Sequence, residues 1–137
     1  LEECKRNGFI KKTMINTAQA QSLLEVADIK EHAVSEAKLT EMNISAYVPM
    51  AYDALREVLE ALCILYGYKV TSHVCTGELV RTLVTDFDYF LFDRLRYIRN
   101  GINYYGRKIG LEEGREIIAK TFALKKEIVK TIKEKLK

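Results

Sequence analysis

The apolar residues of this chain recur at intervals of three and four positions, and this spacing restricts the fold more than any other feature of the sequence. The segment from Ser45 to Tyr66 is the clearest example. Its regularly spaced apolar residues are Tyr52, Leu55, Leu59, Leu62 and Tyr66. Such residues lie on one face of an α-helix, whereas a half-buried strand would alternate apolar and polar positions. We therefore predict an all-α protein.

Five helices are predicted from this spacing and from the residues that begin and end them. The ranges are Phe9 to Lys38 with a break near His32, Ser45 to Tyr66, Thr71 or Ser72 through Leu83, a fourth helix that opens at Thr85 and contains Arg94 to Gly106, and Leu111 to about Leu136. The inner side of the first helix is expected to carry Ile10, Met14, Leu24 and Ala27. Short connections without a Gly/Ser linker indicate one domain over residues 1–137, an up-and-down four- or five-helix bundle.

Helix ends are predicted from capping residues. Pro49 is tolerable only near the first turn of the second helix, and Gly67 can end that helix. Thr85-x-x-Asp88 has the form of a capping box and is expected to open the fourth helix. Glu112 and Glu113 lie in the first turn of the last helix and lysines lie toward its end, the arrangement that the helix dipole favours.

Charge and cysteine content restrict the classes of function. The net charge of +3 is compatible with a polyanionic partner but is below the excess of a dedicated nucleic-acid binder. Cys4, Cys63 and Cys75 are odd in number and far apart, so we predict neither a disulfide framework nor a zinc site. They are interpreted as small apolar residues in a protein of a reducing, cytoplasmic compartment.

The chain is not expected to enter a membrane or an export pathway. It contains no apolar run of about eighteen residues, and its start, LEECKRNGF, lacks the order of a signal peptide. Because the chain begins at Leu1 and not at methionine, trimming or disorder upstream is expected.

The fourth predicted helix carries three distinct faces. Its apolar stripe consists of Leu91, Leu95, Ile98, Ile102, Tyr105 and Ile109. The opposite side carries Arg96, Asn100, Asn103 and Arg107, with Arg99 at the margin of the buried stripe. A third, aromatic strip contains Phe90, Tyr97, Gly101 and Tyr104. A mid-helix glycine costs roughly 1 kcal/mol relative to alanine. We therefore expect another helix, of this chain or of a second copy, to approach closely at Gly101.

The polar face has two interpretations. Arginines opposite an apolar stripe are commonly a solvated surface. Asn100 and Asn103 favour a functional site, because asparagine gains nothing by propensity in the middle of a helix and such local costs occur at sites.

Three short segments carry a resemblance to a known family. They are AYDALREVLEALCILYGY, then TSHVCTGEL at a helix start, then the Arg99-Asn100 pair on a later helix. Their order resembles the HEPN superfamily (higher eukaryotes and prokaryotes nucleotide-binding domain) over nearly the whole chain. The resemblance implies a four- or five-helix bundle and a homodimer. It also implies metal-independent ribonuclease activity in many members, and a small nucleotidyltransferase partner in a toxin–antitoxin pair.

The match to the nuclease members is partial. In them an arginine, often followed by a polar residue, precedes a histidine by four to six positions. Arg99 and Asn100 match the first half, but Tyr104 lies in the second half and no histidine follows His73. A tyrosine, with a pKa near 10, is a poor proton shuttle at neutral pH. The chain thus resembles the branch without the catalytic histidine, and Arg99, Asn100 and Tyr104 are weak candidates for catalysis.

The leading hypothesis is a non-catalytic or weakly catalytic module that binds a nucleotidyltransferase partner, a nucleotide or RNA. The binding residues would be Arg96, Arg99, Asn100, Asn103 and Arg107, and the dimer interface would contain Tyr97, Gly101 and Tyr104. No metal or cofactor is expected. The alternatives are a ribonuclease toxin with a composite dimer site and a bundle without a chemical function.

For the polar residues outside the fourth predicted helix, we predict structural roles and not functional ones. His73 is read as a packing and capping residue and His32 as exposed. The lysines of the last helix are read as a solvated face. They are Lys120, Lys125, Lys126, Lys130, Lys133, Lys135 and Lys137.

Overall fold

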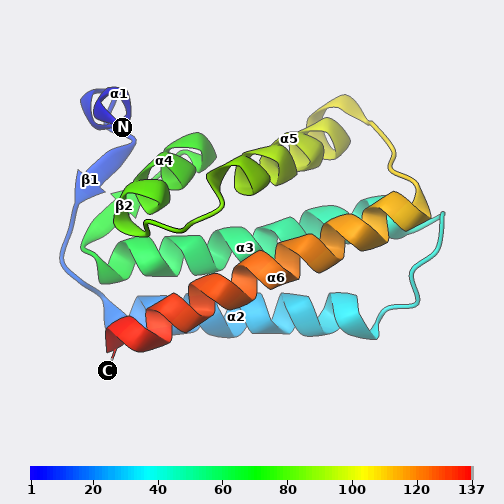
Figure 1. Cartoon of the computed structure of the whole chain (residues 1–137), viewed down its shortest axis with the longest axis horizontal. Helices are drawn as coiled ribbons and strands as arrows, with labels where there is room; N and C mark the ends of the chain where they lie inside the picture. The colour runs from blue at the N-terminus through cyan, green and yellow to red at the C-terminus, as the bar shows by residue number, and fades with distance from the viewer. Residues whose placement is uncertain (137) are drawn as a thin grey trace.

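In a computed structural model that describes residues 1–136, the chain forms six helices and one two-stranded sheet. The elements are α1 (Glu2–Arg6), β1 (Ile10–Lys12), α2 (Thr17–Glu36), α3 (Ile44–Leu65), β2 (Tyr68–Val70), α4 (His73–Leu83), α5 (Tyr89–Tyr105) and α6 (Leu111–Leu136). The predicted all-α helical bundle is confirmed. Figure 1 shows α3 in the middle, with α2 and α6 packed on one side and α4 and α5 on the other.

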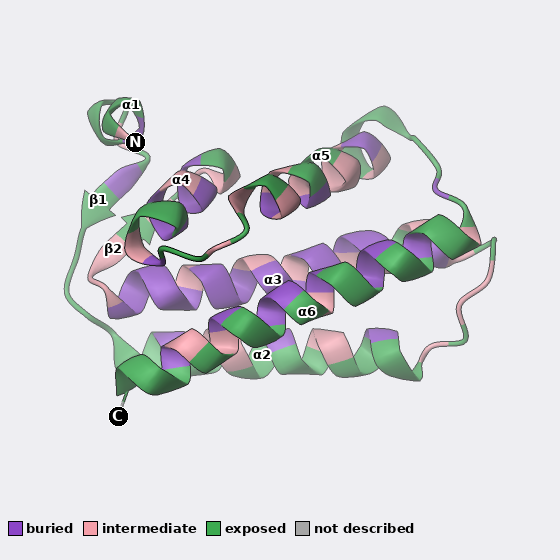
Figure 2. Cartoon of the chain, in the orientation of Figure 1, coloured by how far each residue is buried: buried purple, intermediate pink, exposed green. Residues whose placement is uncertain are grey.

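Helix α3 is the core of the bundle, and burial on nearly all sides explains its high apolar content (Figure 2). Its small residues Ala51, Ala54 and Ala61 are fully buried, which allows neighbouring helices to approach. Tyr66 caps its C-terminus, and Gly67 follows in the left-handed region with a φ of 83°. The predicted range and end of this helix are confirmed.

The predicted helix from Phe9 to Lys38 is wrong in its first part. Ile10 pairs with Val70 in an antiparallel ladder, and α2 begins at Thr17, where the Asn16 side chain accepts a hydrogen bond from the Gln19 amide at 2.9 Å. Met14, expected on the inner side, is exposed. Ile10 finds its strand partner sixty positions away, and no local spacing reveals such a pairing. Helix α2 is also unbroken at His32.

The cysteine interpretation is also corrected. Cys4 of α1 and Cys75 of α4 form a disulfide across 71 positions of sequence, while Cys63 is free and buried as expected. Spacing alone could not reveal the bridge, because only the fold brings the two residues together. The reducing compartment was predicted from cysteines without a disulfide, and the Cys4–Cys75 bridge removes that basis.

The cap of α5 differs from the prediction. The helix begins at Tyr89, and the Asp88 carboxylate accepts a hydrogen bond from the Leu91 amide at 3.1 Å. Thr85 lies in the connection before the helix, so Asp88 is the cap and not the third residue of a capping box. The start of α4 after Ser72 and the range of α6 are confirmed.

Close approach between helices depends on two glycines outside α5. A Cβ atom at Gly77 of α4 would lie 2.9 Å from the Phe92 ring of α5. A Cβ atom at Gly114 of α6 would overlap Ile44 of α3. Both glycines are buried, so each allows a neighbouring element to reach van der Waals distance.

The lysine face of α6 has one exception. Lys125 is buried and forms ion pairs with Asp28 at 2.8 Å and Glu31 at 2.7 Å on α2. It therefore joins two helices and is not part of a solvated face. No helix within residues 1–136 is both long and apolar enough to cross a membrane.

Candidate functional site between α3, α4 and α5

The inner face of α5 follows the predicted stripe over most of its length: Leu95 is buried, and Leu91, Ile98 and Ile102 are partly buried against the core. Phe92 is buried as well, whereas Tyr105 is exposed at 75%; Ile109 is buried but lies beyond the end of the helix. Helix α5 packs against both α3 and α4, and Phe92 fills the contact beside Gly77. Arg96, Arg99 and Asn100 are half-buried instead of fully on the surface, and Arg99 contacts α3.

Arg99 is held by side chains of two helices. Its Nη1 donates to Tyr104 OH at 3.0 Å and to Asn100 Oδ1 at 3.3 Å. Its Nη2 lies 3.8 Å from Asp53 Oδ1 of α3, and its guanidinium carbon lies 5.7 Å from the centre of the Tyr52 ring. The side chain is 14% exposed. Arg99, predicted at the margin of the buried stripe, therefore has a largely buried side chain.

Asp53 lies between two arginines without a close contact to either. Arg56 Nε is 3.9 Å from the same Asp53 oxygen, while Arg56 Nη1 donates to Glu60 at 2.7 Å. Across residues 1–136, no protein group makes a hydrogen bond with Asp53 Oδ1, Arg56 Nε or Arg99 Nε, although all three atoms are buried. Buried polar atoms are normally hydrogen-bonded. Two N–H donors near Asp53, the Nε groups of Arg56 and Arg99, therefore have no hydrogen-bond acceptor among the described residues.

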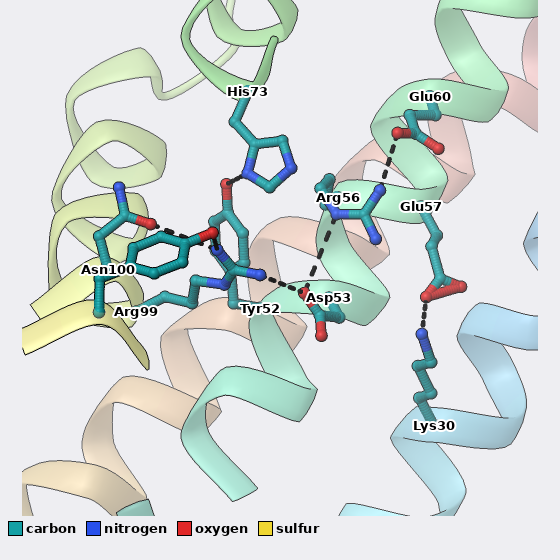
Figure 3. Close-up of polar contacts among 10 residues, drawn as sticks. Lys30, Tyr52, Asp53, Arg56, Glu57, Glu60, His73, Arg99 and Asn100 are labelled. Carbon is teal, nitrogen blue, oxygen red and sulfur yellow. Dashed lines mark hydrogen bonds and ion pairs between the residues drawn. The ribbon is translucent and has the colours of Figure 1, made fainter. Parts of the chain in front are cut away.

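His73 extends this group from the first turn of α4. Ser72 is the cap of α4, because its hydroxyl accepts from the Cys75 amide at 3.4 Å. The imidazole of His73 packs on Tyr52, with Nδ1 3.2 Å from the tyrosine hydroxyl. Figure 3 shows His73 and the guanidinium groups of Arg56 and Arg99 arranged around Tyr52 and Asp53. The predicted packing role of His73 is confirmed and its capping role is wrong.

The charge states of Tyr52 and His73 follow from their surroundings. Burial raises the pKa of Tyr52 far above its usual value, against the opposing effect of Arg99 and Arg56, so its hydroxyl keeps its proton. Burial, followed by the charges of Arg56 and Arg99, lowers the pKa of His73 to about 4. A neutral imidazole and several cations therefore coexist at neutral pH. We call this group the Arg99 cluster; its members are Tyr52, Asp53, Arg56, His73, Arg99, Asn100 and Tyr104.

The five predicted binding residues divide between two surfaces. Arg99 and Asn100 belong to the Arg99 cluster, and Arg96 lies near it but is hydrogen-bonded to Asp93 at 2.9 Å. Asn103 and Arg107 are exposed. Arg107 lines a shallow pocket of about 190 Å³ on the outer face of α5. The other residues of that pocket are Tyr97, Asn100, Gly101, Tyr104 and Tyr105.

Gly101 has a neighbour within its own chain. A Cβ atom there would lie 3.2 Å from Arg107 Cδ, and the Arg107 amide donates to the Gly101 carbonyl at 3.0 Å. Arg107 Nη1 also donates to Tyr97 OH at 3.1 Å. The close approach expected at Gly101 is thus made by Arg107, which folds back after the left-handed turn at Gly106, and not by a helix of this chain.

The residues that α3 and α4 contribute to the Arg99 cluster were not identified from the sequence. A signal was present: Asp53, Arg56 and Glu60 are spaced three and four positions apart on a helix that is otherwise almost wholly apolar. Charged residues on one line of a buried helix require partners on a neighbouring element. The position of His73 beside them had no such signal, because it depends on how α4 packs on α3.

The Arg99 cluster contains two arginines and one carboxylate, Asp53. Among the described residues, no group of three or more His, Cys, Asp or Glu side chains could hold a metal ion. No protein-family model, curated protein or solved structure matches the chain. The relationship to the HEPN superfamily accordingly stays a prediction.

Proposed function

We propose that this protein is a HEPN-type helical module, non-catalytic or weakly catalytic, that binds a phosphate group of a nucleotide or RNA at the Arg99 cluster. The observation that carries the proposal is the pair of guanidinium groups from two helices. Arg56 of α3 and Arg99 of α5 both lie within 4 Å of one Asp53 oxygen, yet each has a buried Nε without an acceptor in residues 1–136.

A phosphate group suits these donors. Guanidinium groups present a planar fork that matches phosphate oxygens, and such charge-assisted hydrogen bonds are among the strongest in proteins. Asp53 opposes an anion by its charge, but it also holds both arginines toward one place. Arg99 is further fixed by Asn100 and Tyr104, so binding would require little reordering of this side chain.

Catalysis is the second candidate function, and His73 is the observation that favours it. Metal-free RNA cleavage needs a proton acceptor, a proton donor and a cation that stabilises the phosphorane. A neutral imidazole beside Arg99 could accept a proton through Nε2 if its Nδ1 carries the proton and donates to Tyr52. If instead the Tyr52 hydroxyl donates to Nδ1, Nε2 carries the proton and cannot act as the base.

The test compares two arginines of α5. Arg99→Gln removes the charge from the cluster, whereas the matched control Arg94→Gln changes an exposed arginine of the same helix. We expect Arg99→Gln to weaken binding of AMP or a short RNA by about 10-fold or more, since a charge-assisted contact contributes roughly 1.5–3 kcal/mol. Equal affinities for both variants and the native protein would refute the proposal. Cleavage of an RNA pool with chelator present, lost in His73→Gln, would support the ribonuclease alternative.

We further propose a homodimer formed through the outer face of α5, and a small nucleotidyltransferase as a second partner. Exposed tyrosines at positions 97, 104 and 105 on this face support the dimer, because aromatic residues are enriched at interfaces. Light scattering at micromolar concentration tests it, and Tyr97→Ser should shift the mass toward the monomer. A monomeric mass at high concentration would exclude this interface.

The cytoplasmic location stays a prediction of the sequence. The Cys4–Cys75 disulfide weighs against it, because disulfides persist mainly in oxidising compartments.

A further inference from the structure

The two-stranded sheet is open along β1. Strand β2 packs on α3 and α4, and β1 lies outside β2 at one end of the bundle (Figure 1). Within residues 1–136 the sheet has no third strand, so the outer edge of β1 pairs with nothing. From Lys11 to Ile15 every residue is exposed. A strand edge of this kind is a template for pairing with another chain.

The hydrogen bonds at the two ends of the ladder show which backbone groups face outward. The Thr13 amide donates to the Gly67 carbonyl at 2.8 Å, and the Thr71 amide donates to the Phe9 carbonyl at 2.9 Å. In an antiparallel ladder such pairs alternate with pairs whose backbone groups point away from each other. The N–H and C=O groups at positions 10 and 12 therefore point away from β2, and no backbone hydrogen bond of the described residues reaches them there.

The hairpin concentrates positive charge at this edge. Lys11 lies directly opposite Lys69 in the ladder, and Lys12 follows on β1. All three lysines are exposed, and none of them forms an ion pair within residues 1–136. Like charges directly opposite each other destabilise a pair of strands. A carboxylate placed beside these lysines would offset that repulsion.

The same lysines exclude a second copy of this chain as the occupant of the edge. Pairing two β1 edges would bring Lys11 and Lys12 of one copy against those of the other, and edge lysines are a common means of preventing such contacts. An acidic segment of a different protein meets no such repulsion. Charge complementarity therefore selects an acidic partner.

Space for an apolar side chain lies at the end of β1. A pocket of about 460 Å³ is lined by Met14 and Ile15 of the β1–α2 connection, by Ile64 of α3 and by Lys69. Met14 and Ile15 are exposed although they are apolar. In strand addition the main chain supplies affinity, and pockets for individual side chains supply specificity. This pocket can therefore receive one apolar residue of a segment that continues past β1.

We infer that β1 is a docking site for an extended acidic segment of a partner protein, which adds to the sheet as a third, antiparallel strand. Its main chain exchanges hydrogen bonds with Ile10 and Lys12, and its carboxylates lie beside Lys11 and Lys12. Because the added strand runs opposite to β1, its apolar residue precedes its acidic residues. The site uses other elements than the Arg99 cluster, so the inference does not depend on the proposed function.

Peptides that differ only in charge test the inference. The probe is a fluorescent peptide of about eight residues, a leucine followed by alternating glutamate and threonine, and matched peptides carry glutamine or lysine in place of glutamate. We expect the glutamate peptide to bind the native protein about tenfold more tightly than the glutamine peptide in anisotropy titrations, and to shift the amide NMR signals of Ile10 and Lys12. Equal affinities of the three peptides, or no binding of the glutamate peptide, would overturn the inference.

N-methylation of the peptide backbone tests pairing through the main chain. Methylating one alternate set of peptide residues removes the donors that face β1, whereas methylating the other set removes donors that face solvent. One set should therefore abolish binding and the other should preserve it. If both methylated peptides bind like the parent, the contact is made by side chains and not by strand addition.

A charge reversal on the protein completes the test. Lys11→Glu should weaken binding of the glutamate peptide about tenfold and should favour the lysine peptide. Its Tm should stay or rise, because a glutamate opposite Lys69 replaces a like-charge pair, so loss of binding cannot be ascribed to misfolding. Lys126→Glu, at an exposed position of α6, should bind both peptides like the native protein.

Two outcomes would assign the edge to another occupant and overturn the acidic partner. Signals of Ile10 and Lys12 that shift with a short RNA but not with the glutamate peptide would make the lysines a nucleic-acid surface. Signals that shift with protein concentration alone would make the edge an interface between copies of this chain.

Discussion

Two groups of charged residues join helices of this bundle. They differ in the distance between their oppositely charged atoms. On one side of α3, Lys125 contacts Asp28 and Glu31 at 2.8 and 2.7 Å, and Lys30 pairs with the buried Glu57. On the other side, Asp53 lies 3.8 and 3.9 Å from Arg99 and Arg56. Figure 3 shows both kinds of contact beside α3.

The difference separates a structural role from a binding role. Burial acts to lower the pKa of Lys125, but its hydrogen bonds to Asp28 and Glu31 raise it overall, so the charged form is stabilised by its partners. Lys125 Nζ therefore has two carboxylate partners within the protein. In the Arg99 cluster the guanidinium Nε atoms of Arg56 and Arg99 retain unused donor capacity across the described part of the chain. Lys125 thus has carboxylate partners at hydrogen-bond distance, whereas Nε of Arg56 and Nε of Arg99 have none among the described residues.

Replacing Lys125 tests the structural side and should have the largest effect. Its side chain is 4% exposed, so Lys125→Ala removes a buried stem as well as the charge. We expect the free energy of unfolding to fall by about 2–4 kcal/mol in urea denaturation. Lys125→Met retains the volume and should recover most of this loss. Lys126→Ala, at an exposed neighbour, should cost less than about 0.5 kcal/mol. If Met is as harmful as Ala, the ion pairs and not the packing stabilise this contact.

The disulfide constrains the side of the bundle that carries the Arg99 cluster. It joins α1 to the first turn of α4, two positions after His73. The double variant Cys4→Ser/Cys75→Ser should lower the free energy of unfolding by about 2–4 kcal/mol, because the open chain gains entropy when unfolded. Hydrogen exchange should increase most in α1 and at the start of α4. Reducing agent should lower the Tm of the native protein and leave that of the double variant unchanged. An equal shift in both would contradict the assignment.

Stability should depend on pH through His73. Its pKa in the folded protein, about 4, lies below the usual value of 6.5, so the unfolded chain binds the proton first as the pH falls. The contribution is therefore complete above pH 6.5 and is lost as the pH decreases toward 4. Because the ring is only half-buried and solvent screens it, we expect a loss of roughly 1–2 kcal/mol. His73→Gln should remove this slope in denaturation from pH 7 to 4, and His32→Gln should keep it.

The smallest effect on stability is expected for Asp53→Asn. This variant tests whether the Arg99 cluster differs in role from the ion pairs of Lys125. Asp53 makes ion pairs at 3.8 and 3.9 Å without hydrogen bonds through Oδ1, so we expect a change of less than about 1 kcal/mol in the free energy of unfolding. Sulfate affinity should rise severalfold, because a repelling charge is lost. A loss near 3 kcal/mol with unchanged affinity would show that the Arg99 cluster, like Lys125, serves structure.

Local patterns predicted much of the fold but only part of the site. Arg99 and Asn100 were selected because an arginine and a poor helix former occur together on an amphipathic helix. Their partial burial was not predicted, because it depends on the partners that α3 supplies, such as Asp53 beside Arg99. Tyr52 was predicted only as an apolar residue of its helix, and no role was predicted for Asp53.

The sequence by itself determined the helical class, the ranges of α3, α4 and α6, and the left-handed end of α3 at Gly67. These features depend on spacing, capping and backbone preference within a few turns. Tertiary structure alone decided the β1–β2 pairing, the Cys4–Cys75 bridge, the burial of Lys125 and the meeting of His73 with Arg56 and Arg99. Each of these joins residues more than fifteen positions apart. Such contacts depend on how helices pack against one another, and the pattern along a single helix does not specify which residue of another helix it will meet.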